Sequence, residues 1–266
     1  MTFETIRVEC DSRGIARLVL DRPQKHNALS AQMIAEIAQA IDALGCDESV
    51  RVVVLAGEGP SFCAGGDLGW MQQQMRADGP TRAAEAGRLA AMLGAVNRCP
   101  RPVIGRVHGN AFGGGIGLIS VCDVAVGVDD ARFGLTETRL GLIPATIGPY
   151  VVARMGESMA RRVFMSGRLF GAEEAVQLGL LARVVAPGDL DDAVDAEIEP
   201  YLSCAPGAVA EAKALVRRLG APIDDSVVAM TIKALVQRWE SAEAAEGIAA
   251  FFEKRAPSWK RGPTQG

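Results

Sequence analysis

The sequence predicts an α/β fold, with a largely parallel sheet followed by a helical C-terminal region. Short apolar runs rich in branched residues alternate with helical patterns of about ten residues through the first two thirds of the chain, an order typical of strands joined by crossover helices. From Leu190 onward helical patterns dominate. The 266 residues, 49% of them hydrophobic, can bury a sizeable core. We therefore expect one domain with a small appendage.

The first elements are a strand, a helix and a second strand. Residues 15–20 (IARLVL) form a branched apolar run that Pro23 ends, because proline cannot continue a hydrogen-bonded ladder. Ser30 is a plausible N-cap for a helix whose apolar residues recur at a spacing of three and four. Residues 51–56 (RVVVLA) return to strand, and glycines turn the chain out of it.

The middle of the chain repeats this order. A strand at 103–107 leads into the apolar run 111–128, which we interpret as a buried helix followed by a strand at 123–128. Asp123 interrupts this run and argues against a lipid-exposed helix. The acid itself is expected to be a buried structural acceptor.

The last third of the chain is mainly helical. A short helix at 172–178 ends at a glycine C-cap, Gly179, and a last strand lies near 182–185. In the C-terminal region we expect three prolines to mark helix boundaries: Pro200, Pro206 and Pro222.

Charge and composition exclude several classes of protein. The net charge of −4 gives no electrostatic support for binding nucleic acid or an acidic membrane. The six cysteines are scattered without a CxxC pair, as expected of buried free thiols in a reducing compartment. The N-terminal residues resemble neither a signal peptide nor a transit peptide, so we expect a cytoplasmic protein. No His/Cys/carboxylate cluster has metal-ligand spacing, and we expect no metal.

Two glycine-rich segments follow predicted strands, at 61–68 (SFCAGGDL) and 109–117 (GNAFGGGIG). Glycines let a ligand approach the backbone, and N–H groups at a helix N-terminus suit a developing negative charge. A dinucleotide fingerprint in the second segment is incomplete, since Ser120 stands where glycine or alanine is required. A Gly-Lys-Ser/Thr phosphate loop is absent from the sequence.

Four segments, DRPQKHNALS, SFCAGGDL, HGNAFGGGIGLISVCD and RFGLTETRLGLIPA, occur in an order and spacing that resemble the crotonase (enoyl-CoA hydratase/isomerase) family. The resemblance implies a core of β-β-α spiral turns over residues 1–195 and a helical oligomerisation region over residues 196–266. It also implies a homotrimer or a dimer of trimers.

The same resemblance implies the site residues. The backbone amides of Gly66 and Gly114 would form an oxyanion hole for a thioester, and Glu137 would transfer protons. Gly117 stands where hydratases of the family carry a second glutamate. This departure and the unusual segment 142–150 resemble the bacterial branch associated with methylglutaconyl-CoA hydration or its terpenoid counterpart.

Further residues are expected around the substrate. Coenzyme A, which is part of the substrate and so implies no separate cofactor, would meet these residues: Lys25, Ala28, Ala64, Gly66, Asp67, Leu68, Phe251 and Lys254. Arg88 or Arg139 could meet the distal carboxylate of a methylglutaconyl group, and Thr146 could position water. His26 and His108 lack a nucleophile in a suitable order, so structural roles are expected for both.

We therefore expect a lyase that adds water to an α,β-unsaturated acyl-CoA, with 3-methylglutaconyl-CoA or a similar branched substrate in first place. Two alternatives remain open. One is an enoyl-CoA double-bond isomerase, which also needs one base. The other is a non-catalytic homologue that binds CoA or RNA.

Overall fold

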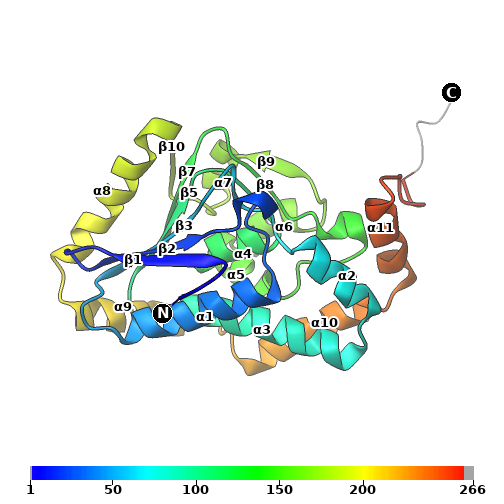
Figure 1. Ribbon diagram of the computed structural model, residues 1–266, viewed down its shortest axis with the longest axis horizontal. Coiled ribbons are helices and arrows are strands. Elements are labelled where there is room, and N and C mark those ends of the chain that lie inside the picture. Colours follow the sequence, from blue (N-terminus) through cyan, green and yellow to red (C-terminus); the bar gives the residue numbers. More distant parts are fainter. Residues whose placement is uncertain (1, 261–266) are drawn as a thin grey trace.

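The computed structural model of the protein describes residues 2–260 and contains two β-sheets (Figure 1). The larger sheet has six strands in the order β1-β2-β3-β5-β7-β10. Only β1 is antiparallel to its neighbour; the other four pairings are parallel. The bounds of its strands are β1 Ile6–Cys10, β2 Ile15–Leu20, β3 Val52–Gly57, β5 Val103–Val107, β7 Val124–Val128 and β10 Arg183–Val185.

The smaller sheet has four strands in the order β4-β6-β8-β9, each three residues long. The pairings of β4 with β6 and of β6 with β8 are parallel, and β9 closes the sheet as an antiparallel edge. The bounds are β4 Ser61–Cys63, β6 Asn110–Phe112, β8 Arg132–Gly134 and β9 Leu169–Gly171. The carboxyl ends of three neighbouring strands therefore meet at one edge, where the candidate site lies.

Helices cover both faces of the larger sheet. In Figure 1, α1 and α3 lie on one side of it and α8 on the other. The helices of the core are α1 Ala31–Cys46, α2 Leu68–Arg76, α3 Gly79–Arg98, α4 Gly114–Val121, α5 Gly148–Met155, α6 Glu157–Phe164, α7 Ala172–Gln177 and α8 Leu190–Leu202. The remaining helices are α9 Pro206–Leu219, α10 Asp225–Trp239 and α11 Ala242–Phe252.

The predicted α/β elements are confirmed where their patterns were long. Ser30 caps α1 as expected, because its hydroxyl accepts a hydrogen bond from the Met33 amide at 3.2 Å. The apolar run 111–128 is indeed a buried helix followed by a strand, α4 and β7. Asp123 is a structural acceptor as expected, since its carboxylate accepts from the Val103 amide at 2.7 Å, but its side chain is partly exposed rather than buried.

Three expectations need correction. Pro200 does not mark a boundary but lies inside α8, near its end, whereas Pro206 begins α9 as expected. Only three of the six free cysteines are buried; the exposed ones are Cys10, Cys46 and Cys204. The sequence patterns also gave no prediction of β1, of the four strands of the smaller sheet, or of helices α2 and α3. The strands of the smaller sheet are three residues long, and runs of that length show no periodicity.

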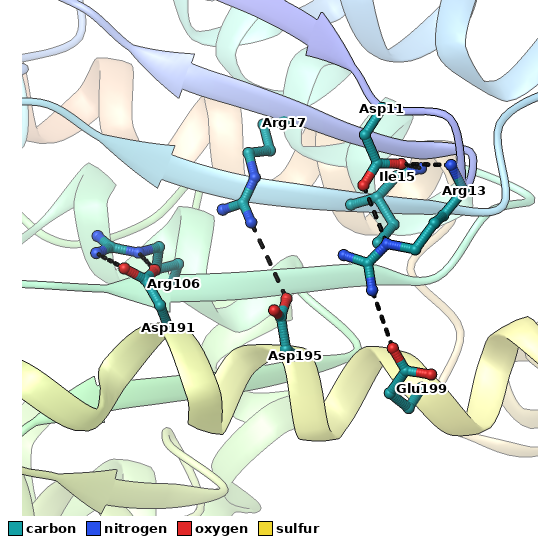
Figure 2. A network of polar contacts seen from close by, with 8 residues as sticks. All are labelled: Asp11, Arg13, Ile15, Arg17, Arg106, Asp191, Asp195 and Glu199. Carbon is teal, nitrogen blue, oxygen red and sulfur yellow. Dashed lines mark hydrogen bonds and ion pairs between the residues drawn. The ribbon is translucent and has the colours of Figure 1, made fainter.

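Helix α8 faces the sheet with a row of carboxylates (Figure 2). Asp191, Asp195 and Glu199 recur every four residues, so they lie on one face of the helix. Each meets an arginine of the sheet or its turns, in the pairs Asp191–Arg106 at 2.6 Å, Asp195–Arg17 at 4.0 Å and Glu199–Arg13 at 3.0 Å. The row aligns α8 across β5, β2 and the β1–β2 turn.

Helix α9 of the C-terminal region is attached to the core by a partly buried ion pair. Lys213 of α9 donates to the Asp123 carboxylate at 2.7 Å and to the Arg101 carbonyl at 3.1 Å. Helix α10 packs against α3, and α11 lies at the opposite end of the molecule from α8 (Figure 1). The expected division at residues 195 and 196 falls within α8, whose Ile198 belongs to the main core, and the division stays a prediction. Among residues 2–260, no helix combines the length and apolarity needed to cross a membrane.

Candidate active site

Three adjacent parallel strands bring the predicted catalytic residues together. Gly66 follows the last residue of β4 by three positions, Gly114 follows β6 by two, and Glu137 follows β8 by three. Because parallel strands present their carboxyl ends at one edge, residues 23 to 71 positions apart in sequence become neighbours. Ligands of α/β sheets bind outside this edge.

The first loop directs the amide of Gly66 away from the segment that contains Leu29. Gly66 forms a parallel bridge with Leu29, in which the Leu29 amide donates to the Gly65 carbonyl at 2.7 Å and the Asp67 amide donates to the Leu29 carbonyl at 3.0 Å. These bonds use the residues on either side of Gly66, so its own N–H points in the opposite direction.

The second loop presents the amide of Gly114. Gly114 is the first residue of α4, and the N–H groups of a first helical turn have no partner within the helix. Gly113 precedes it with φ at 47°, in the left-handed region that glycine adopts readily. The two loops touch, because a Cβ placed on Gly65 would lie 3.7 Å from the Gly114 nitrogen. Both free amides therefore belong to one small region.

The segment 22–29 holds the first loop in place, a role that the sequence patterns did not indicate. The buried Asn27 side chain donates to the carbonyls of Glu58 and Ser61, both at 2.8 Å, and accepts from the Arg22 amide at 2.9 Å. The His26 carbonyl accepts from the Ala64 amide at 2.9 Å. Asn27 has φ at 54°, which asparagine tolerates better than most residues. This geometry gives the DRPQKHNALS motif a physical role.

Glu137 begins a short 3-10 helix, Glu137–Leu140, and its carboxyl group lies over Gly113. The Oε2 atom is buried and has no hydrogen-bond partner among the described residues. Burial raises the pKa of this carboxyl to about 7, opposed by a hydrogen bond from its own amide. A Cβ on Gly113 would lie 2.9 Å from Oε1, so only glycine leaves room for the acid. An acid with a pKa near neutrality can both accept and return a proton.

Ile147 packs over Gly117, the position at which the family resemblance implies a second glutamate. A Cβ added to Gly117 would lie 2.5 Å from Ile147 Cγ2 and 3.7 Å from Leu93 Cδ2. Distances below 3.0 Å cannot be tolerated without a shift, so α4 and the segment before α5 are packed for glycine at this position. Among the described residues that line the site, Glu137 carries the only carboxyl group.

A cavity of about 360 Å³ opens over these groups. Gly66, Gly114 and Glu137 all line it, and the rest of its wall is mainly apolar. In the part of the chain that the structure describes, the hydroxyl and carboxyl side chains of the wall are those of Thr136, Glu137 and Thr146. Its main apolar wall residues are Leu29, Trp70, Leu140, Leu142, Ile147 and Trp239.

The other predicted binding residues divide into two sets. Ala64, Leu68 and Phe251 line the cavity, and the last two are about half exposed. Four residues lie outside the cavity wall: Lys25, Ala28, Asp67 and Lys254. Asp67 instead caps α2 through the amides of Gly69 and Trp70, and pairs with Arg22 at 2.9 Å.

The histidines and the two candidate arginines also lie outside the cavity wall. The His26 ring meets the Ser61 hydroxyl at 3.1 Å, and the His108 ring meets the Gly59 carbonyl at 2.9 Å. Both contacts hold loops, which fits the structural roles expected. Burial lowers the pKa of His108. Arg88 is paired with Glu85, and Arg139 is exposed. Among the described residues, no group of three or more His, Cys, Asp or Glu could hold a metal ion.

An apolar cavity with two backbone donors and one buried acid at its end defines a class of enzyme site, suited to oxyanion stabilisation and proton transfer. Comparisons with known proteins then identify the family. Residues 11–262 match the sequence model of Enoyl-CoA hydratase/isomerase. The chain belongs to this family, within the crotonase superfamily, as its four motifs predicted.

Relatives and solved structures agree with this membership. A putative enoyl-CoA hydratase from Thermus thermophilus is 34% identical over 253 residues, which cover 94% of this chain and 99% of the relative. An enoyl-CoA hydratase structure from Shewanella pealeana superposes with a TM-score of 0.80 at 36% identity, covering 97% of this chain and 96% of that one. A putative enoyl-CoA hydratase structure from Mycobacterium avium paratuberculosis gives 0.85 at 30% identity, covering 96% and 99%. The predicted crotonase-like fold is confirmed.

Proposed function

We propose that this protein is an enoyl-CoA hydratase-type lyase, which adds water to the double bond of an α,β-unsaturated acyl-CoA with a branched acyl chain. The observation that carries the proposal is the meeting of Gly66, Gly114 and Glu137 around one apolar cavity. Family membership supports the reaction class, and the relatives from Thermus thermophilus and Shewanella pealeana bear the name enoyl-CoA hydratase.

In the proposed reaction, the thioester oxygen accepts hydrogen bonds from the amides of Gly66 and Gly114. Addition at the β-carbon moves charge onto this oxygen, so two fixed donors stabilise the enolate that forms. Each donor of this kind contributes about 3 kcal/mol to the barrier reduction. Because both donors are backbone groups held by neighbouring strands, no side chain needs to move.

Glu137 carries the protons in this scheme. Its carboxylate takes one proton from water, the resulting hydroxide adds to the β-carbon, and the carboxyl group returns the same proton to the α-carbon. One acid suffices if both transfers occur on the same face of the alkene. A pKa of about 7 suits both directions of transfer.

A double-bond isomerase is the second candidate, and the packing at Gly117 is the observation that favours it. Ile147 occupies the space of a second carboxylate, so this site holds one base rather than two. An isomerase needs one base to move a proton between the α- and γ-carbons. Incorporation of label from heavy-oxygen water separates the two candidates, because only hydration incorporates it.

The side chains that line the cavity indicate which acyl group it favours. A 3-methylglutaconyl group carries a distal carboxylate, which would require a cation or several donors. Within residues 2–260, no Lys, Arg or His lines the cavity, and the candidate Arg88 is already paired with Glu85. Among branched substrates, the lining therefore favours an uncharged one such as 3-methylcrotonyl-CoA over 3-methylglutaconyl-CoA.

The CoA arm would leave through the exposed part of the wall. Leu68 and Phe251 lie there, and the exposed Lys25 and Lys254 are proposed to meet phosphates. CoA enters as part of the substrate, and the reaction as written needs no other cofactor. A cytoplasmic location and a trimeric or hexameric assembly remain predictions.

A panel of thioesters tests the reaction. The protein is incubated with crotonyl-, 3-methylcrotonyl-, 3-methylglutaconyl- and 3-enoyl-CoA, and the products are identified by mass. Loss of conjugation with a gain of one water from a branched substrate supports hydration. Conjugation gained from the 3-enoyl substrate without a change of mass identifies an isomerase instead. Salt-sensitive RNA binding without any turnover would support a non-catalytic homologue.

Glu137→Gln tests the assignment of the acid. We expect hydration to fall by about 10²- to 10⁴-fold, the usual contribution of a positioned acid or base. The matched control is Glu9→Gln, which removes an exposed carboxylate on β1 far from the cavity wall. Near-normal hydration by Glu137→Gln would overturn the mechanism.

A further inference from the structure

Thr146 carries the second unpaired polar group of the cavity wall. The residue is only 4% exposed, and its Oγ1 is buried without a hydrogen-bond partner among the described residues. The other such atom in the wall is Oε2 of Glu137. A buried hydroxyl without a partner costs about 1–3 kcal/mol, so an orphan of this kind requires an explanation.

A structural role as a helix cap does not explain Thr146. Threonine is often found where a helix begins, because its hydroxyl can accept from the first amides. Helix α5 begins at Gly148, and its cap residue is Ile147, with no side-chain cap hydrogen bond. The turn before α5 is held by backbone bonds, from Ala145 to Ile143 at 2.8 Å and from Gly148 to Ala145 at 3.0 Å. The hydroxyl takes no part in holding this turn.

The position of Thr146 in the chain connects its unpaired hydroxyl with the absence of a second carboxylate. Its neighbour Ile147 is the residue that fills the space of the second carboxylate above Gly117. The segment with Ile147 therefore leaves no room for a carboxylate at position 117. The neighbouring residue Thr146 adds a hydroxyl group to the cavity wall. A hydroxyl can donate and accept, and rotation about the Cα–Cβ bond exchanges its position with that of the methyl group.

We propose that the Thr146 hydroxyl binds and orients the water that Glu137 activates, in place of the missing second carboxylate. This inference rests on the proposed hydratase function. The hydroxyl accepts a hydrogen bond from the water, or donates one to it, and keeps its own proton. Glu137 still takes one proton from the water and returns it to the α-carbon, so the balance of the reaction is unchanged.

The test compares two reactions of the same site. Hydration of an enoyl-CoA needs the water, whereas exchange of the α-protons of butyryl-CoA in heavy water needs only the amides and Glu137. We expect Thr146→Val to lower kcat for hydration by about 10- to 100-fold, as misplacement of a reactant does, and to leave the exchange rate unchanged. Thr146→Ser, which keeps the hydroxyl, should restore most of the hydration rate.

The thermal stability of the Thr146→Val variant serves as a control for a structural effect of the substitution. Thr146→Val removes an unpaired hydroxyl at nearly constant volume, so its Tm should equal or exceed that of the wild type. Thr138→Val, outside the cavity wall, should change neither reaction.

Equal loss of hydration and exchange in Thr146→Val would show a structural role and overturn the inference, as would unchanged hydration. Failure of the wild type to hydrate any enoyl-CoA while still exchanging α-protons would instead overturn the hydratase proposal, and the inference with it.

Discussion

The space above Gly117 accounts for the single carboxylate of this site. The glycine at this position is coupled to Ile147, because a Cβ and the isoleucine methyl cannot both be accommodated at 2.5 Å. Restoring a side chain at 117 therefore requires a change at 147 as well. The space over Gly117 is therefore filled by the packed side chain of Ile147 and is not an empty space left by an absent side chain.

Gly117→Ala tests this coupling. We expect the single variant to be destabilised by about 1–3 kcal/mol, since overpacking forces neighbours to shift. Ile147→Ala alone should cost about 2–5 kcal/mol. The double variant should be more stable than the sum of the two predicts, because the smaller residue makes room for the new methyl. Urea unfolding of all three variants measures the coupling.

Gly207→Ala is the matched control, because a Cβ there meets no atom within 4 Å and the residue lies in α9. It should be neutral or stabilising, by up to about 1 kcal/mol. A Gly117→Ala variant as stable as the wild type would contradict the packing argument.

The buried acid predicts a pH dependence of stability. Burial raises the pKa of Glu137 from 4.5 to about 7, so the folded protein binds this proton more tightly than the unfolded chain. Ionisation of the folded acid therefore costs stability, from nothing below pH 4.5 to its full value above pH 7. The full cost is at most about 3 kcal/mol at 1.36 kcal/mol for each pH unit, and less where water reaches the carboxyl.

Glu137→Gln removes this titration and measures it. The stability of the variant relative to wild type should rise between pH 4.5 and pH 7 and then level off. Denaturant unfolding at several pH values gives the difference at each. A difference that does not change with pH would mean that Glu137 is ionised as easily in the folded protein as in water. The hydration rate of the wild type should rise with pH across the same range, since the base must be ionised.

At the scale of elements, prediction succeeded where a local pattern was clear and failed where contacts distant in sequence decide the structure. Length alone was not sufficient, because the longest helix, α3, was not predicted. The IARLVL strand and the helix capped by Ser30 follow from local periodicity and capping. Strands β4, β6 and β8 are only three residues long, and their pairing depends on contacts distant in sequence.

The site shows the same division. Gly66, Gly114 and Glu137 were predicted because the four motifs carry them, and the structure brings them to one cavity, although the single residues show little on their own. Asn27 and Ile147 were missed, because their roles arise from packing against segments far along the chain. A buried asparagine between loops has no periodic signature, although its position in the DRPQKHNALS motif could have indicated it.

Helix α8 allows a comparison between charge and packing. The three ion pairs of Figure 2 are partly exposed, and such pairs contribute about 0–1 kcal/mol each. Ile198 on the same helix is fully buried in the core. We expect the triple variant Asp191→Asn, Asp195→Asn, Glu199→Gln to lose less stability than Ile198→Ala alone, which should lose about 2–5 kcal/mol.

Urea unfolding at low and high salt measures the contributions of the ion pairs and of core packing to stability. Salt should reduce the loss in the triple variant, because it screens exposed charges, and leave the loss in Ile198→Ala nearly unchanged. A larger loss from the charge variant than from Ile198→Ala would show that the ion pairs, rather than the core, attach α8 to the sheet.

At the scale of the whole molecule, α9 carries an apolar surface that the described chain leaves uncovered. Leu215, Val216 and Leu219 are 50%, 70% and 79% exposed and lie within one and a half turns of the helix. Contiguous exposed apolar residues mark association surfaces, and burying one such side chain contributes about 1.5–3 kcal/mol. The surface fits the trimeric assembly expected for this chain.

Val216→Asp with Leu219→Asp tests whether this surface joins subunits. We expect the wild type to behave as a trimer or a dimer of trimers in light scattering after size exclusion, and the double variant to dissociate, because two buried charges without partners oppose association. Glu211→Lys, an exposed charge change on the same helix, should leave the assembly intact. A monomeric wild type would contradict the predicted assembly, and a double variant that remains assembled would place the contact on another surface.

Helix α9 is attached to the core by the ion pair between Lys213 and Asp123. Loss of assembly should therefore leave the fold of each subunit intact, which circular dichroism can check.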